Sequence, residues 1–135
     1  MTPTERGLLS LLLLAYLAAG FLHFAHNAEF LSDYPNLPTW LTRSKVYLTW
    51  MGLAAIGLAG IALYLRRWYW CGLSLIGLYA AFGFDGLLHY TRAPFAAHTV
   101  TMNLTIWFEA MAATALLVAV VFAVLKRLHE HVFDT

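Results

Sequence analysis

The sequence predicts an all-α integral membrane protein, a four-transmembrane-helix bundle in up-down order with both termini cytoplasmic. Of its 135 residues, 61% are hydrophobic and only 11% are charged, with a mean hydropathy of +0.70. A soluble domain of ordinary composition is about 25% charged. The apolar residues gather in long stretches, and a helix needs about 20 such residues to cross the hydrocarbon core of a bilayer. Because backbone polar groups in hydrocarbon must be bonded internally, we interpret these stretches as helices.

The predicted spans follow one another along a single domain, residues 1–135. They cover about residues 7–26, 46–65, 68–90 and 98–125. The first is dominated by the run Leu11–Leu14, and the second contains no ionisable residue. Small residues at Ala18–Gly20 would also suit a signal-peptide cleavage site, but Glu5 offsets the positive charge of Arg6 that such a peptide needs. We therefore expect the first stretch to be a span.

The connections between the spans determine which spans are neighbours. The turn at Arg66 and Arg67 is short, so the second and third spans must lie side by side and antiparallel. The loop at residues 91–97 is also short. The first loop is longer and contains Pro35 and Pro38, which exclude a continuous helix. We expect this loop to cover one end of the bundle.

Lysine and arginine counts favour one orientation in the membrane, since cytoplasmic loops carry an excess of these residues. On one side of the predicted bundle lie Arg6, Arg66, Arg67, Lys126 and Arg127. The other side carries Arg43, Lys45 and Arg92. The bias predicts that both termini are cytoplasmic, in a multi-pass protein of a bacterial inner membrane.

Charge and cysteine content exclude some classes of function. The formal net charge is +1, with no basic stripe that could neutralise nucleic-acid phosphates. Cys71 is the only cysteine, so neither an intrachain disulfide nor a CxxC metal knuckle can form. The partners that we expect are the lipid bilayer and either other membrane subunits or further copies of the chain.

Five ionisable residues near span ends carry the main prediction about function. Ionisable residues within spans are costly, so each one requires a reason. His23 and His26 close the first span, Asp85 and His89 close the third, and His98 opens the fourth. Spans one and three run in the same direction and the fourth begins where they end. A rise of about 1.5 Å per residue then places all five residues in one layer at the outer end of the bundle.

Imidazole and carboxylate groups gathered in one layer suit a transition-metal ion such as copper, iron or zinc. We predict His23, His26, His89 and His98 as metal ligands, with Asp85 either as a further ligand or as the group that orients His89. The alternative interpretation is a hydrogen-bond network that only holds the helices together, at about 0.6 kcal/mol per bond.

Glu109 lies in the fourth span, about 16 Å deeper than His98 at the helical rise and so near the bilayer midplane. A charge at that depth costs at least about 3 kcal/mol. We therefore expect Glu109 to face the bundle interior and to be protonated. Glu109 and Asp85 would supply the two carboxyl groups that acid–base catalysis requires. The alternative is a neutral structural group bonded to Thr105 or to a backbone carbonyl.

The pattern Asp85-x-x-x-His89, followed by His98, resembles the intramembrane copper-site motif in the C subunit of the particulate methane and ammonia monooxygenases. The likeness covers residues 85–98, and the gap before the final histidine is shorter here. The resemblance implies a metal site at these three residues.

Together these features predict a membrane-embedded protein that binds a transition metal at the outer end of the bundle. An enzyme of this kind would oxidise a lipophilic small molecule that enters from the bilayer, with Glu109 as a proton donor. Two alternatives remain open. One is a haem b protein with two axial histidines that passes electrons to quinone. The other is a structural subunit of a larger membrane complex.

Overall fold

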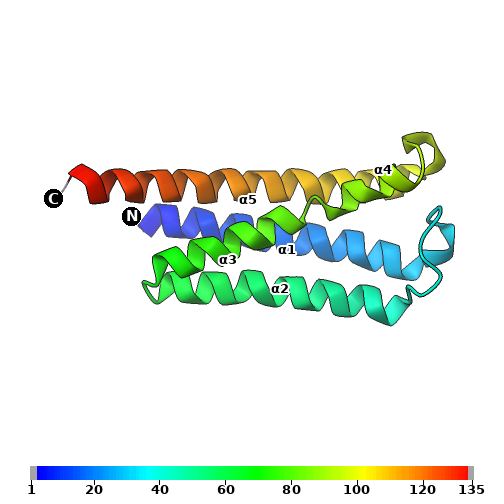
Figure 1. Ribbon diagram of the computed structural model, residues 1–135, viewed down its shortest axis with the longest axis horizontal. Coiled ribbons are helices and arrows are strands. Elements are labelled where there is room, and N and C mark those ends of the chain that lie inside the picture. The colour runs from blue at the N-terminus through cyan, green and yellow to red at the C-terminus, as the bar shows by residue number, and fades with distance from the viewer. Residues whose placement is uncertain (1–2, 134–135) are drawn as a thin grey trace.

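The computed structural model describes residues 3–133, and every regular element in that range is helical (Figure 1). It contains four helical segments long and apolar enough to cross a membrane. These segments are Glu5–Glu29, Arg43–Leu65, Tyr69–Arg92 and Val100–His131. The described residues include no strand. The predicted all-helical class, with four helices long and apolar enough to span a membrane, is confirmed.

Five α-helices and three short 3₁₀ turns make up the described chain. The α-helices are α1 (Pro3–Glu29), α2 (Arg43–Leu65), α3 (Tyr69–Phe82), α4 (His89–Arg92) and α5 (Val100–Phe133). The 3₁₀ turns are η1 (Leu31–Asp33), η2 (Asp85–Leu88) and η3 (Phe95–Ala97). The side chain of Thr42 caps α2 by accepting from the amide of Lys45 at 3.3 Å, which fixes where that helix begins.

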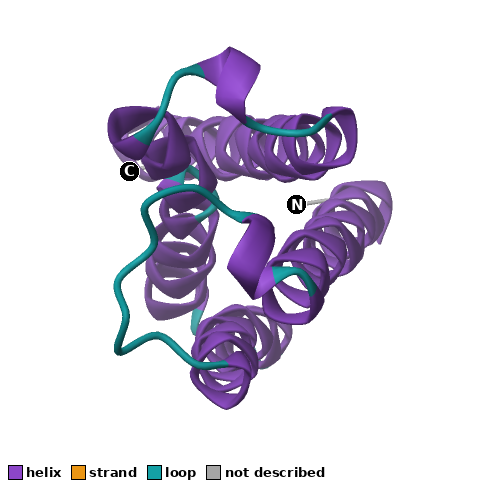
Figure 2. Ribbon diagram, turned by 90° about the vertical axis from the view of Figure 1, so that its right-hand side faces the viewer, coloured by secondary structure: helices purple, strands orange, loops and turns teal. Residues whose placement is uncertain are grey.

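The helices form a ring around one interior. Helix α1 packs against α2 and α5, and α3 packs against the same two helices from the other side. The two termini lie at one end of the bundle, and the segments with η1 and η3 lie at the other (Figure 1). We call the latter the loop end. Figure 2 looks onto it and shows the first loop crossing over the helices. The expected packing of the second span against the third is confirmed, since α2 and α3 are in contact.

The third span is interrupted after α3, whereas the sequence predicted one continuous helix over residues 68–90. The amide of Gly83 bonds to the carbonyl of Ala80 at 3.1 Å in a tighter turn, and α3 ends. Tyr16 of α1 donates its hydroxyl to the carbonyl of Tyr79 at 3.2 Å, just before the break. A side chain at Gly83 would meet Tyr16 Oη at 2.7 Å and also Ala113 of α5. The break therefore lies where three helices are in close contact.

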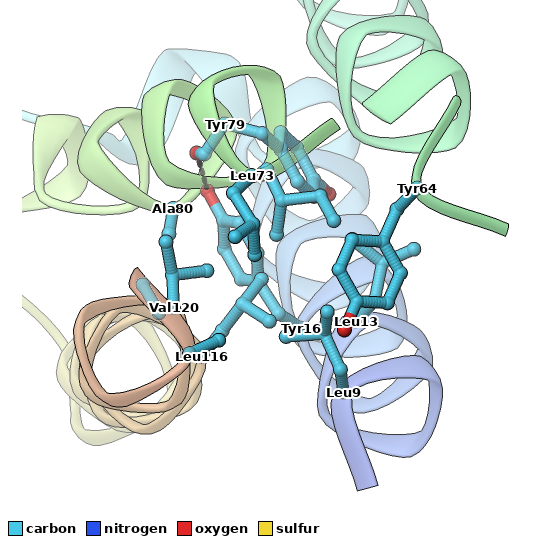
Figure 3. Close-up of a cluster of buried hydrophobic side chains, with 12 residues drawn as sticks. Leu9, Leu13, Tyr16, Tyr64, Leu73, Tyr79, Ala80, Leu116 and Val120 are labelled. Carbon is cyan, nitrogen blue, oxygen red and sulfur yellow. Dashed lines mark hydrogen bonds between the residues drawn. The ribbon is translucent and has the colours of Figure 1, made fainter. Parts of the chain in front are cut away.

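The bundle interior is divided along its length. The half that holds the termini has an apolar core of leucine, isoleucine, valine, alanine and tyrosine side chains (Figure 3). Its largest fully buried members are Leu13, Tyr16, Tyr64, Leu73, Ile76, Tyr79 and Leu116. The buried polar residues His23, His89, His98, Asn103 and Glu109 lie in the other half, toward the loop end. All five come from segments other than α2.

Close packing of α2 on α3 depends on glycine, and we predict that a methyl group at Gly60 destabilises the fold. A Cβ there would meet Ile76 Cγ1 at 2.8 Å and the Ile76 amide nitrogen at 2.9 Å. Such overpacking costs about 1–3 kcal/mol. Gly52 in the same helix has nothing within 4 Å of an added Cβ. Thermal unfolding in detergent should show Gly60→Ala clearly less stable and Gly52→Ala unchanged or slightly more stable. Equal behaviour of the two variants would contradict this packing.

Candidate functional site

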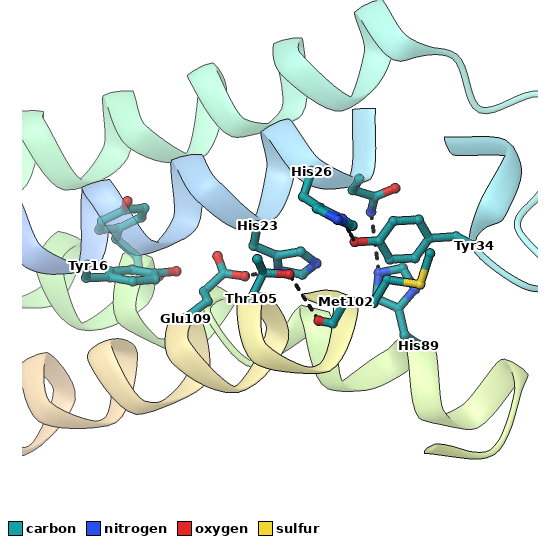
Figure 4. A network of polar contacts seen from close by, with 10 residues as sticks. Tyr16, His23, His26, Tyr34, His89, Met102, Thr105 and Glu109 are labelled. Atoms are coloured by element: carbon teal, nitrogen blue, oxygen red, sulfur yellow. Dashed lines mark hydrogen bonds and ion pairs between the residues drawn. The ribbon is translucent and has the colours of Figure 1, made fainter. Parts of the chain in front are cut away.

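A buried carboxyl–imidazole pair joins α1 to α5. His23 and Glu109 are each only 2% exposed, and His23 Nδ1 is hydrogen-bonded to Glu109 Oε2 (Figure 4). The expected interior position of Glu109 is confirmed. Its partner is His23 rather than Thr105, whose hydroxyl donates to the carbonyl of Met102 at 3.0 Å. Removing either partner of such a pair would leave a polar group buried without compensation.

Two glycines make room for this pair. An added Cβ at Gly20 of α1 would lie 3.0 Å from Glu109 Oε1. An added Cβ at Gly86 of η2 would lie 2.6 Å from His23 Cε1 and 3.6 Å from Glu109 Oε2. Gly86 reaches the pair because the third span changes course at Gly83. The break in that span therefore shapes the site.

Three imidazoles follow one another from the pair toward the loop end. The ring centroids of His23 and His89 are 5.6 Å apart, and those of His89 and His98 are 6.1 Å apart. His89 begins α4. His98 lies before α5 in extended backbone, with φ −98° and ψ 143°. The sequence predicted that the fourth span begins at His98, and this was wrong because η3 and the extended His98 precede α5, which begins at Val100.

Each of the three rings has one anchored nitrogen and one free nitrogen. His23 Nδ1 is bonded to Glu109, and His98 Nδ1 donates to the carbonyl of Pro94 at 3.1 Å. His89 Nε2 lies 3.4 Å from the side-chain nitrogen of Asn27. The other nitrogens, His23 Nε2, His89 Nδ1 and His98 Nε2, are buried without a hydrogen-bond partner.

The amide of Asn27 decides which nitrogen of His89 carries the proton. Its Oδ1 atom is buried and also without a partner. Turning the amide over would let Oδ1 accept from His89 Nε2–H, and His89 Nδ1 would then keep a free lone pair. All three imidazoles would in this way be held through one nitrogen and could coordinate an ion through the other, as metal-ligating histidines usually do.

Asp85 lies beside the carboxyl–imidazole pair. Its carboxylate accepts from the amide of Gly86 and interacts electrostatically with Glu109 and His23, while Oδ1 is buried without a partner. The predicted span 68–90 placed Asp85 and His89 in one continuous α-helix, where residues four apart lie about one turn from each other. The residues between them form the 3₁₀ segment η2 instead, which has three residues per turn, so that α-helical relation does not hold.

His26 is held by a residue that sequence reasoning missed. Tyr34, in the first loop, is 3% exposed, and its hydroxyl bonds to His26 Nδ1 at 2.9 Å (Figure 4). Its ring centroid lies 4.9 Å from that of His89. Burial raises the pKa of the Tyr34 phenol to about 12, so the phenol keeps its proton at neutral pH. The only signal in the sequence was an aromatic residue in a proline-containing loop expected to cover the bundle end.

The first loop is fastened over the site by a second contact. The side-chain amide of Asn36 donates to the carbonyl of Arg92 at 2.8 Å, which joins the first loop to the end of α4. Asn36 has a positive φ of 57°, a left-handed conformation that asparagine tolerates better than most residues. The expected cover is therefore present, and it inserts Tyr34 next to His89.

The side chains of the site are not arranged to coordinate a metal ion. Within residues 3–133, no group of three or more His, Cys, Asp or Glu side chains is placed to hold one ion. The free nitrogens of His23, His89 and His98 would have to turn toward a common point. The ligand set predicted from the sequence stays a prediction.

Comparison with known proteins finds no matching family model, no matching curated protein and no matching solved structure. A function for this chain must therefore come from the chemistry of its own residues.

The buried pair makes a direct prediction about stability. Glu109→Ala leaves His23 Nδ1 buried without a partner and should lower the free energy of unfolding by about 3–5 kcal/mol. Glu109→Gln keeps the shape and one accepting oxygen, so its loss should be smaller. The matched control is Glu130→Ala, which removes a half-exposed carboxylate 3.9 Å from Lys126 and should cost at most about 1 kcal/mol. Unfolding measured in detergent decides the question, and equal losses for Glu109→Ala and Glu130→Ala would contradict a stabilising pair.

Proposed function

We propose that this protein binds one transition-metal ion through His23, His89 and His98, in the loop-end half of a membrane-spanning bundle. The observation that carries the proposal is the set of three buried, unpartnered nitrogens on rings 5.6 and 6.1 Å apart. Two imidazoles that ligate one ion tetrahedrally, with metal–nitrogen distances of about 2.0–2.1 Å, have ring centroids about 5 Å apart. The His23–His89 and His89–His98 spacings are close to this value, and the rings would have to turn for their free nitrogens to face one ion.

The groups behind the rings support the same function. Glu109, Pro94 and Asn27 each contact the nitrogen that faces away from the proposed ion. Partners of this kind orient ligating imidazoles, and a carboxylate also makes the ring a stronger donor. Imidazole ligands suit zinc, copper and iron, and Asp85 would add an oxygen ligand or a proton acceptor. His26 is left out of the proposed ligand set because neither of its nitrogens is among the buried, unpartnered ones.

The buried polar residues extend from the site toward the loop end of the bundle and not toward the termini. The series from His98 to Glu109 is followed, deeper in the bundle, by Tyr16 and then by the apolar core. The described residues thus form no polar path to the other end. This supports binding or redox chemistry with access from the loop end, rather than conduction across the membrane. In the enzyme version, a lipophilic molecule is oxidised at the metal, and Glu109 supplies or accepts protons.

The test is the metal content of protein purified from membranes in detergent, before and after loading with Co²⁺ or Zn²⁺. We expect about one ion per chain, and replacing the ligand His89 with Gln should weaken binding at least about tenfold. His131→Gln is the control, because His131 is exposed at the other end of the bundle. A Soret band in the purified protein would favour the haem b alternative. A protein that takes up no ion, with His89→Gln indistinguishable from the parent, would favour the structural-subunit alternative.

The proposed function includes insertion into a bacterial inner membrane with both termini in the cytoplasm. The supporting observations are the four apolar helices and the bias of lysine and arginine toward the end that holds the termini. Reporter fusions after Thr135 should be active on the cytoplasmic side. Reporters inserted between Asn36 and Thr39 should be active on the opposite side. Equal signals from both positions would overturn the four-span topology.

A further inference from the structure

The end of the bundle that holds the termini carries more positive than negative charge (Figure 1). Its described lysines and arginines are Arg6, Arg66, Arg67, Lys126 and Arg127, and its described carboxylates are Glu5 and Glu130. Both carboxylates lie next to the same cation, since Lys126 Nζ is 2.5 Å from Glu5 and 3.9 Å from Glu130. Orientation in a membrane accounts for the number of these cations but not for where their side chains lie.

The guanidinium of Arg127, in α5, is held by an aromatic ring rather than by a carboxylate. Its Cζ atom lies 3.4 Å from the centroid of the Tyr69 ring, at the start of α3. Such stacking fixes the guanidinium plane and leaves its in-plane N–H groups available to an acceptor. Its Nε atom is buried without a hydrogen-bond partner. The salt bridges among residues 3–133 do not include Arg127, so this fixed cation has no carboxylate partner there.

A second guanidinium, that of Arg6 in α1, lies near the same place. Tyr64 of α2 is only 1% exposed and interacts electrostatically with both Arg127 and Arg6. The Nε atom of Arg6 is also buried without a hydrogen-bond partner. Two positive charges that converge at the edge of a low-dielectric interior repel each other. An anion bound beside them would relieve this repulsion.

A small polar pocket of about 250 Å³ opens beside Arg127, between α3 and α5. It is lined by Trp70, Arg127, Glu130 and His131. Trp70 is 50% exposed, and Trp68, just before α3, is 66% exposed. Tryptophan side chains at the ends of membrane-spanning helices lie at the level of the lipid head groups. The pocket is therefore at the depth where a lipid phosphate would reach it.

We propose that this pocket binds the phosphodiester group of an anionic membrane lipid, with Arg127 as the main donor and Arg6 as a second cation. The planar guanidinium fork matches two phosphate oxygens. The excess of positive charge favours a head group with a net negative charge over a zwitterionic one. The exposed tryptophans favour a lipid over free phosphate as the source of the anion. The pocket lies at the opposite end of the bundle from His23, so binding does not depend on the proposed metal site.

Lipid selectivity tests this proposal. The full chain is placed in nanodiscs of equimolar phosphatidylglycerol and phosphatidylcholine with identical acyl chains, and the lipids that remain bound after release into detergent are counted by native mass spectrometry. We expect one phosphatidylglycerol per chain, retained over phosphatidylcholine by about fivefold or more. Equal retention of the two lipids would overturn the proposal. Excess inorganic phosphate should not displace the bound lipid, and displacement would contradict a site for lipid.

Variants assign the preference to the guanidinium groups. Arg127→Gln should lower it about fivefold, the effect expected of one arginine at an anionic surface. Arg127→Lys keeps the charge but loses the planar fork, and should retain part of the preference. The control is Arg43→Gln, because Arg43 is an exposed arginine at the loop end that is bonded to Glu29 at 2.6 Å. Arg6→Gln provides a second test if Arg127→Gln fails to fold. A preference unchanged in both Arg127→Gln and Arg6→Gln would contradict the proposed site.

Discussion

The hydrogen bond between His23 and Glu109 constrains more of this structure than any other contact. In an apolar interior, a carboxyl group and an imidazole are each costly alone and tolerable together. Keeping them together requires α1 and α5 to be neighbours. The face of α1 that carries His23 must also be turned toward the face of α5 that carries Glu109. Keeping them together also requires small residues around the pair, which Gly20 and Gly86 provide. Gly86 belongs to η2, the 3₁₀ segment that follows the break of the third span at Gly83, so irregular backbone lies directly beside the pair.

The same pair lies at the border between two kinds of interior. Toward the termini, the core is apolar apart from tyrosines such as Tyr16, whose hydroxyl is bonded to a backbone carbonyl. Toward the loop end, buried imidazoles hold unpartnered nitrogens. A chain that needed only stability would gain little from leaving those nitrogens unpaired, because each one costs desolvation free energy. This cost is the reason to regard the loop-end half as a site for a ligand.

Tyr34 connects features that would otherwise be separate. Its hydroxyl is hydrogen-bonded to His26, and its ring lies beside the ring of His89. The loop that carries it is fastened to α4 by Asn36. The loop over the bundle end and the proposed metal ligand His89 therefore meet at the side chain of Tyr34. Any movement of the first loop would change the surroundings of both histidines together.

The sequence by itself determined the helical class, the four long apolar helices and the presence of histidines near their ends at one end of the bundle. Hydrocarbon leaves the backbone few alternatives to helix, and the depth of a residue follows from its position along a span. The sequence did not determine that Glu109 pairs with His23, because such a pairing depends on how each helix is rotated about its axis. Only the tertiary structure decided the break at Gly83, the displacement of His98 from α5 and the insertion of Tyr34. Each depends on contacts between segments far apart in the chain, which local periodicity does not record.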